Sequence, residues 1–365
     1  MQKLPIKGTK MAFSRLGLGT GTGFNNDSGK SQKEFFLAFD ASIDSGINWI
    51  DTAESYSNGY AESLIGEYSK KSKNNFYVAS KFSPINASKK KLRQACESSL
   101  KRLNRECIDL YQIHWMNYNI PIAETMDTLM SLKKEGKIRA IGVCNFCESE
   151  ILNCNEELLV SNQIEFNLFN RIAEKGLLSF HKKNNLISIS YSPFEGLKNL
   201  IPESKKNKIF NDLMKKYSAT SFQIVLSFLT IYENMLVTFS STNYNHIIEN
   251  SKVFDIDKND LKIISQTFSS SLKLIDPKLI KILSTKSNKF YDNLFDAELN
   301  KHGYFPGIEE LSKEFLMSNN FKPIKLKKIQ DRHFEYELIG GMMRYWSWVK
   351  AYNGERYVLA YITNE

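Results

Sequence analysis

Short apolar runs alternate with longer amphipathic segments over the first three quarters of the chain. This alternation is typical of repeated βα units. The expected strands are Leu16 to Gly21, Asn48 to Thr52, Phe76 to Lys81, Ile108 to His114, Ile138 to Val143, Asn162 to Phe166, Ile187 to Ser192 and Leu236 to Ser240. The intervening helices are expected to begin near Ser31, Ala61, Ser88, Ile122, Glu148, Lys175, Lys208 and Asn243. Eight such units predict a closed (β/α)8 barrel.

A doubly wound parallel sheet is the rival architecture. It would normally carry a glycine fingerprint that opens the first helix. Gly17, Gly19, Gly21 and Gly23 alternate inside the first strand and its turn instead. The glycine cluster is therefore a weak dinucleotide signal, and the barrel is the preferred prediction.

Four polar residues stand at or just beyond the ends of three expected strands: Asp51, Tyr56, Lys81 and His114. The C-terminal strand ends of a parallel barrel face one mouth, so these side chains are expected to meet there. Together they suit protonation of a carbonyl oxygen. Tyr56 is the expected acid, and the ammonium of Lys81 is expected to lower the pKa of the phenol. Asp51 would hold Lys81 in place, and His114 would orient the substrate oxygen.

Several longer segments occur in a fixed order. They are Gly46-Ile47-Asn48-Trp49-Ile50-Asp51-Thr52-Ala53-Glu54-Ser55-Tyr56, Ser80-Lys81, Asp109-Leu110-Tyr111-Gln112-Ile113-His114, Gly142-Val143-Cys144-Asn145-Phe146, Asn162-Gln163 and Tyr191-Ser192-Pro193. Over about residues 11–268 the chain resembles the aldo-keto reductases. The resemblance implies an NAD(P)H-dependent reductase that transfers hydride to an aldehyde or ketone. A small polar carbonyl compound is the expected substrate, and a sugar-like compound is one candidate.

The same resemblance implies a cofactor site. Asn145 and Gln163 match positions that bind the nicotinamide carboxamide, and Tyr191 matches the ring that stacks on it. The pyrophosphate and adenosine positions correspond to Ser192, Phe194, Ser240, Ser241, Asn243, Glu249 and Asn250. Family members that bind a 2′-phosphate commonly carry Lys where this chain has Ser240, and Arg where it has His246. NADP(H) is the expected cofactor, with NAD(H) as the alternative.

Three aromatic residues near strand ends, Phe24, Phe82 and Trp115, are expected to form apolar walls beside the substrate. Cys144 and Cys147 form a CxxC pair without a second pair or a histidine cluster. A redox or zinc role is therefore not expected, and no metal is predicted.

The cysteine spacing, the apolar runs and the net charge of the chain argue against several classes of protein. The five cysteines lack the spacing of a disulfide framework, and no apolar run reaches the roughly 18 residues of a membrane span. The N-terminus has no signal-peptide core, so a cytoplasmic location and no membrane association are expected. The net charge of +9 is scattered along the chain. It favours anionic small molecules, and nucleic-acid binding is not expected. The oligomeric state stays open.

The βα rhythm stops near Ser269, and the predicted organisation is a barrel over residues 1–268, a polar linker over 269–274 and a small α+β domain over 275–365. In the last part, helices are expected at Leu279 to Leu283, Ile308 to Met317 and Met343 to Tyr352, and strands at Pro323 to Lys327, Glu335 to Ile339 and Tyr357 to Ile362.

This last part resembles the ParB/sulfiredoxin fold. The resemblance rests on segments that include Phe321-Lys322-Pro323-Ile324-Lys325-Leu326 and Tyr336-Glu337-Leu338-Ile339-Gly340-Gly341-Met342-Met343-Arg344-Tyr345. It implies phosphate contacts by Gly341 and Arg344, so a nucleotide is a candidate ligand; a glycine turn with a structural arginine is the alternative. Met342 stands where sulfiredoxins have their reactive cysteine, so sulfiredoxin activity is not expected. The alternative function for the whole chain is a regulatory protein that senses cofactor and nucleotide through this domain.

Overall fold

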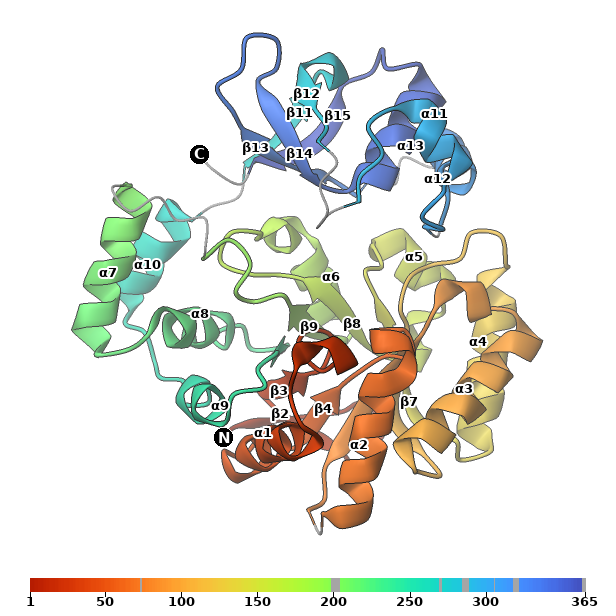
Figure 1. The fold of residues 1–365 in the computed structure, drawn as a ribbon, viewed down its shortest axis with the longest axis vertical. Coiled ribbons are helices and arrows are strands. Elements are labelled where there is room, and N and C mark those ends of the chain that lie inside the picture. Colours follow the sequence, from red (N-terminus) through yellow and green to blue (C-terminus); the bar gives the residue numbers. More distant parts are fainter. Residues whose placement is uncertain are drawn as a thin grey trace. The chain divides into compact units, whose positions relative to one another are not determined.

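The computed structural model describes residues 1–72, 74–197, 204–268, 271–283, 289–304, 306–317 and 322–362. The chain divides into two compact units, and each is described by itself (Figure 1). The first comprises Met1–Met116 and Ile122–Phe268, and the second comprises Asn117–Pro121 and Ser269–Glu365.

The first unit is built on a closed barrel of eight parallel strands. They are β3 (Leu16–Gly19), β4 (Trp49–Asp51), β5 (Tyr77–Phe82), β6 (Ile108–Ile113), β7 (Ile138–Cys144), β8 (Leu159–Glu165), β9 (Ile187–Tyr191) and β10 (Met235–Phe239). They pair in chain order, and β10 closes the ring on β3 through the register Val237↔Leu16. The predicted barrel is confirmed, since each expected strand overlaps one of these eight.

The described residues of this unit also form α-helices that lie outside the strands (Figure 1). They are α1 (Gln32–Asp44), α2 (Tyr60–Lys71), α3 (Lys89–Leu103), α4 (Ile122–Lys134), α5 (Glu148–Asn153), α6 (Leu177–Lys183), α7 (Lys205–Tyr217), α8 (Ser221–Leu229), α9 (Tyr244–Asn250) and α10 (Lys258–Thr267). Ser31 begins α1 with a capping box to Glu34, which explains why this start was predictable. Helices α8 and α10 were not predicted. The residues of α8 are mostly apolar and buried from Ile224 to Leu229, so the helix shows little polar periodicity.

A packed floor closes the N-terminal end of the barrel. A hairpin of β1 (Lys3–Pro5) and β2 (Ala12–Ser14) carries Phe13, whose ring stacks on Trp49 at 5.2 Å and on Tyr77 at 5.2 Å. Trp49 donates its indole N–H to the carbonyl of Ser14 at 2.9 Å. At Gly17 a Cβ would stand 2.3 Å from the Trp49 ring, so this strand needs glycine there. With the floor filled, the opposite mouth remains for chemistry.

The second unit contains a mixed five-stranded sheet in the order β11-β15-β13-β14-β12. Its strands are β11 (Ser271–Ile275), β12 (Ile280–Lys281), β13 (Ile324–Lys328), β14 (Tyr336–Gly340) and β15 (Val358–Ile362), and its helices are α11 (Leu294–Leu299), α12 (Ile308–Met317) and α13 (Met342–Tyr352). Side chains of the sheet and of α13, such as Ile324, Leu338 and Tyr345, form a separate hydrophobic core. The predicted α+β composition of this part is confirmed.

Two sequence predictions in this unit are wrong. The polar linker was expected over 269–274, but Ser271–Ile275 is strand β11, paired antiparallel with β15; residues 269 and 270 lie outside the described part. A strand at the edge of a sheet tolerates polar residues, which explains the error. The helix expected from Leu279 to Leu283 is instead the end of a 3-10 turn followed by β12. Within the described ranges, no helix has the length and apolar character needed to cross a membrane.

Candidate active site

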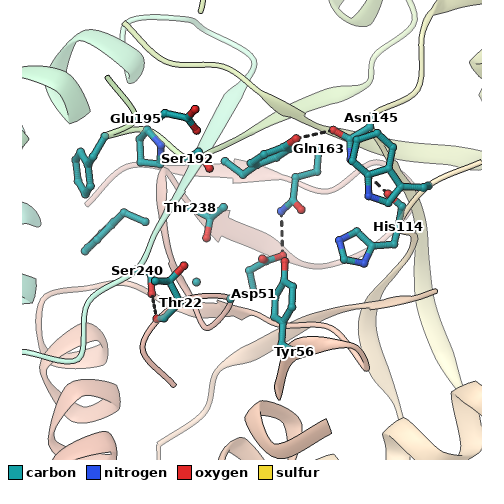
Figure 2. Close-up of a pocket in the computed structure, with 17 residues that line it drawn as sticks. Thr22, Asp51, Tyr56, His114, Asn145, Gln163, Ser192, Glu195, Thr238 and Ser240 are labelled. Carbon is teal, nitrogen blue, oxygen red and sulfur yellow. Dashed lines mark hydrogen bonds between the residues drawn. The ribbon is translucent and has the colours of Figure 1, made fainter. Parts of the chain in front are cut away.

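A cavity of about 480 Å³ opens at the C-terminal ends of the barrel strands (Figure 2). The residues around it come from the ends of the strands and the loops that follow them. They are Gly19, Gly21, Thr22, Asp51, Tyr56, His114, Trp115, Asn145, Gln163, Tyr191, Ser192, Pro193, Phe194, Glu195, Thr238, Phe239 and Ser240. This is the mouth at which barrels of this kind place their chemistry.

The structure brings the four predicted polar residues together. The Lys81 ammonium lies 2.8 Å from Asp51 Oδ2 and 3.2 Å from the Tyr56 hydroxyl, and it also donates to the carbonyl of Thr52 at 2.9 Å. The rings of Tyr56 and His114 meet edge to face with centroids 5.8 Å apart. Three donors on Lys81 therefore have three oxygen partners, and this fixes the ammonium beside the phenol.

Tyr56 reaches the cavity because of a tight turn before α2. Ser57, Asn58 and Gly59 all have positive φ, at 50°, 54° and 85°. At Gly59 a Cβ would stand 2.7 Å from Arg102 Cδ, so glycine is needed for both conformation and space. Across the cavity, a Cβ on Gly21 would stand 3.2 Å from the Tyr56 ring. The small residue at 21 keeps the approach to the phenol open.

Burial dominates the electrostatics of this site. It opposes the charge of the fully buried Lys81, but Asp51 and then Tyr56 overcome it and raise the pKa of the ammonium above its usual range. Burial is also the largest influence on Tyr56 and raises the pKa of its phenol; Lys81 lowers it, and Asp51 raises it. The net shift is upward, so the expectation of a lowered Tyr56 pKa is wrong. Burial and then Lys81 lower the pKa of His114 to about 3, so its imidazole is neutral at physiological pH.

The predicted carboxamide and stacking residues form one wall beside these four. Gln163 donates its Nε2 to Asp51 Oδ1 at 2.9 Å (Figure 2). Tyr191 donates its hydroxyl to Asn145 Oδ1 at 2.8 Å, and Asn145 Nδ2 donates to the carbonyl of His114 at 3.4 Å. The wall is thus hydrogen-bonded directly to two of the four predicted polar residues, Asp51 and His114.

The remaining predicted cofactor residues fall into two groups. Ser192, Phe194 and Ser240 line the cavity, and Ser240 donates its hydroxyl to the carbonyl of Thr22 at 2.6 Å. Ser241, Asn243, Glu249 and Asn250 are not among the lining residues. They belong to the turn before α9 and to α9 itself, where the Asn243 side chain caps the helix.

A nicotinamide dinucleotide fits the donor set of this cavity. Thr238 is 5% exposed and its hydroxyl has no hydrogen-bond partner within the described structure, although it lines the cavity. At Gly19 a Cβ would stand 2.8 Å from that hydroxyl, so the glycines of β3 and its turn leave a shallow cradle opposite it. Sequence reasoning missed Thr238. Its signal was present, because Thr238 shares the inward face of β10 with Leu236, two residues earlier.

The profile of the Aldo/keto reductase family matches residues 15–267. The chain belongs to the aldo/keto reductase family. It is an oxidoreductase that reduces carbonyl groups with NAD(P)H, as the sequence predicted.

Individual family members are similar over most of their own length. Methylglyoxal reductase YeaE of Escherichia coli is 28% identical over 244 residues, which cover 66% of this chain and 86% of that protein. The NADH-specific methylglyoxal reductase of Escherichia coli is 32% identical over 228 residues, which cover 53% of this chain and 68% of that protein. The crystal structure of the thermostable aldo-keto reductase Tm1743 with epalrestat has a TM-score of 0.67 and 29% identity, and covers 73% of this chain and 100% of that one. The crystal structure of a Klebsiella pneumoniae aldo-keto reductase in complex with NADPH has a TM-score of 0.67 and 27% identity. The match covers 73% of this chain and 96% of that one.

One prediction about the walls of this aldo-keto reductase site is largely wrong. Of the three aromatic residues expected there, Trp115 lines the cavity, but Phe24 and Phe82 do not. Phe24 is buried against Phe35 and Phe39, under α1. Phe82 follows the inward-facing Lys81, so its side chain points to the outer face of the barrel. It packs there on the ring of Tyr111 at 5.4 Å.

The CxxC pair of the reductase is split between two environments. Cys144 is buried, burial raises the pKa of its thiol, and the thiol donates to Gln163 Oε1 at 3.7 Å. Cys147 lies at the start of α5, with its sulfur 3.4 Å from the Ser149 hydroxyl. Neither of these two cysteines forms a disulfide. Among the described residues, no group of three or more His, Cys, Asp and Glu side chains is arranged to hold a metal.

In the second unit, Gly341 precedes α13 with a φ of 86°. Arg344 lies in the first turn of that helix, and its Nη1 donates to the carbonyl of Lys322 at 3.3 Å. A Cβ on Gly341 would stand 3.0 Å from Arg344 Nη2, so the guanidinium lies directly over the glycine.

Proposed function

We propose that this aldo-keto reductase reduces small polar aldehydes and ketones, with Tyr56 as the proton donor. The observation that carries the proposal is the phenol 3.2 Å from a buried ammonium at the cavity wall. The similarity to two methylglyoxal reductases supports a small dicarbonyl compound as substrate, and a sugar-like aldehyde is the alternative within the same class.

A nicotinamide dinucleotide bound in this cavity would supply the hydride. As the carbonyl oxygen gains negative charge, Tyr56 gives it the phenolic proton. Lys81 then faces the new phenolate, and Asp51 keeps the ammonium from swinging away. His114 is neutral, so one ring nitrogen donates a hydrogen bond to the same oxygen while the ring carries no charge. Solvent at the cavity mouth returns the proton to Tyr56.

Cofactor orientation is assigned to the wall beside these residues. The amides of Asn145 and Gln163 would bind the carboxamide, the ring of Tyr191 would stack on the nicotinamide, and Ser192, Phe194 and Ser240 would face the pyrophosphate. Ser241, Asn243, Glu249 and Asn250 remain proposed contacts for the adenosine end. NADP(H) is the first choice because related structures hold it. NAD(H) is the competitor, since an NADH-specific relative exists and this chain has Ser240 and His246 in place of the Lys and Arg expected to bind a 2′-phosphate.

The Tyr56→Phe variant tests the assignment. Loss of the proton donor should lower kcat with NADPH and methylglyoxal by about 10²- to 10⁴-fold. The affinity for NADPH, measured by fluorescence quenching, should stay within about twofold, because the hydroxyl is bonded to Lys81 rather than to the proposed cofactor wall. Tyr60→Phe, on α2 and outside the cavity lining, is the matched control. Wild-type turnover in Tyr56→Phe would sink the assignment.

We further propose that the second unit is a ParB/sulfiredoxin-like module that binds a nucleotide phosphate at Gly341 and Arg344. The left-handed glycine at the start of α13 and the arginine over it support this, since backbone N–H groups and a guanidinium together suit a phosphate. Thermal shifts of the full chain with ATP, CTP and NADPH test it. Nucleotide stabilisation that Arg344→Ala abolishes, with the NADPH shift unchanged, is the expected result. The same result would favour the alternative role of a nucleotide sensor attached to the reductase.

A further inference from the structure

His181 on α6 is completely buried. It lies behind the cofactor wall, which is the wall of the cavity formed by Asn145, Gln163 and Tyr191. Its Nδ1 lies 2.8 Å from the hydroxyl of Ser188, and its Nε2 lies 3.0 Å from Nδ2 of Asn162. Asn162 in turn is bonded to the backbone of Phe146. The imidazole therefore stands in a chain of hydrogen bonds between two strands and the loop that follows β7.

These contacts determine the tautomer of His181. Asn162 donates Nδ2 to the carbonyl of Phe146 at 2.7 Å and accepts the N–H of Phe146 on Oδ1 at 3.3 Å, so its amide can have one orientation only. The second hydrogen on Nδ2 then points at His181 Nε2, which must accept it. The ring proton is therefore on Nδ1 and is donated to Ser188. Burial lowers the pKa of His181 to about 4, which keeps the imidazole neutral and able to accept.

The chain of contacts ends at the two amides of the cofactor wall. Asn145 directly precedes Phe146 and has a φ of 64°, a left-handed conformation that asparagine adopts more readily than most other residues. Its backbone N–H donates to the carbonyl of Gln163 at 2.8 Å. Gln163 directly follows Asn162. One side chain, Asn162, thus fixes the backbone next to both amides, and His181 fixes Asn162.

We propose that His181 is a positioning residue for the nicotinamide end of the cofactor site. It supplies the acceptor that Asn162 needs to hold the Asn145–Phe146 backbone in register with Gln163. This inference rests on the proposed function, in which Asn145 and Gln163 bind the carboxamide. His181 itself touches neither substrate nor cofactor.

Two substitutions of His181 distinguish the role of Nδ1 from the role of Nε2. His181→Asn places its amide near the former Nδ1, so it keeps a partner for Ser188 and leaves Asn162 Nδ2 without one. His181→Gln reaches the former Nε2 and restores an acceptor for Asn162. Each variant is titrated with NADH and with ADP-ribose, which share the adenosine and pyrophosphate parts and differ in the nicotinamide.

In His181→Asn we expect the Kd for NADH to rise about tenfold, because the backbone beside Asn145 and Gln163 is no longer held in place, while the Kd for ADP-ribose stays within about twofold. In His181→Gln both values should stay within about threefold of wild type. Ser188→Ala is the matched control for the other nitrogen and should resemble His181→Gln. An unchanged ratio of the two Kd values in His181→Asn would overturn the proposal, whether both ligands bind more weakly or neither does. A His181→Gln variant that binds NADH as weakly as His181→Asn does would also overturn it.

A second measurement applies to the unmodified full chain. Nitrogen-15 NMR of histidine-labelled protein should show a His181 ring protonated on Nδ1 that does not titrate above about pH 5. An Nε2-protonated ring would refute the proposal even if His181→Asn failed to fold. The carboxamide assignment is tested separately by Asn145→Ala: if that variant leaves the NADH to ADP-ribose ratio unchanged, the proposed function fails at that point, whatever His181 does.

Discussion

Replacing Lys81 by methionine removes the charge beside the phenol at nearly constant side-chain volume. At the observed 3.2 Å between Nζ and the Tyr56 oxygen, and an effective dielectric constant of about 20, the ammonium stabilises a phenolate by about 5 kcal/mol. General acid catalysis as a whole is worth about 10²- to 10⁴-fold. We therefore expect Lys81→Met to lower kcat by about 10³-fold, because the phenol can no longer release its proton at low cost.

The same substitution leaves Asp51 buried without its cation. Breaking one side of a buried ion pair typically costs about 3–5 kcal/mol of folding stability, which could obscure the catalytic effect. The double variant Asp51→Asn/Lys81→Met removes both charges, and the carbonyl oxygen of the introduced amide can still accept from Gln163. Its free energy of unfolding should return to within about 1 kcal/mol of wild type, while kcat stays depressed by about 10²- to 10³-fold.

The assay follows oxidation of NADPH with methylglyoxal as substrate, and chemical denaturation gives the free energy of unfolding. A deuterated reduced cofactor shows whether hydride transfer limits turnover in each variant. If the double variant regains both stability and at least about a tenth of wild-type kcat, then Lys81 serves folding rather than proton transfer, and the Coulomb reasoning is refuted.

The other predictions concern the cavity and its titration. Thr238→Val should leave the melting temperature of the free protein unchanged or higher, because a buried unpartnered hydroxyl is lost, yet weaken NADPH binding about threefold to tenfold in a fluorescence titration. Wild-type affinity would exclude a contact between Thr238 and the cofactor. Ser240→Lys/His246→Arg should raise the ratio of kcat/KM for NADPH over NADH by at least about tenfold, through charge-assisted contacts to the 2′-phosphate; an unchanged ratio would contradict the proposed adenosine site. Because burial lowers the pKa values of His114 and His181 to about 3 and about 4, the unfolded chain binds protons below about pH 6.5 that the native protein does not. The free energy of unfolding should therefore fall as the pH drops from 7 to 5 in denaturation series, and the fall should be shallower in His114→Gln; identical slopes would argue against a neutral, buried His114.

The barrel was predictable because its strands are buried on both sides. Every residue of Ile108–Ile113 is buried, and the run is mostly apolar although Asp109 and Gln112 lie inside it. The candidate site residues Asp51 and His114 stand at or just after the end of a strand. Asp51 and His114 were found in this way, from position along the chain alone. Strand β11 could not be found by the same signal, since Ser271–Ile275 is an edge strand whose one partner among the described strands is β15.

The walls of the site were harder to predict than its polar residues. Proximity to a strand end placed Phe82 next to Lys81, but consecutive residues of a strand point to opposite faces. Once Lys81 is assigned to the interior, Phe82 belongs outside, which is where its ring packs on Tyr111. Phe24 follows an irregular glycine-rich turn, so no periodicity gave its direction. The same alternation could have predicted from the sequence that Thr238 faces the interior of the barrel.

The direction in which the pKa of Tyr56 shifts depends on how deeply the phenol is buried. The sequence does not show how deep that burial is. The spacing of residues placed a cation next to the phenol, and Lys81 does act to lower its pKa, but burial and Asp51 act the other way. A raised pKa is compatible with the role of acid. The alkoxide formed by hydride transfer is comparable in basicity to hydroxide, whose conjugate acid has a pKa of about 15.7, so the transfer is favourable even from a reluctant phenol. In the proposed mechanism, Tyr56 therefore holds its proton throughout the neutral range and releases it when negative charge develops on the substrate oxygen. Lys81 would act after the proton has left, by stabilising the phenolate that remains.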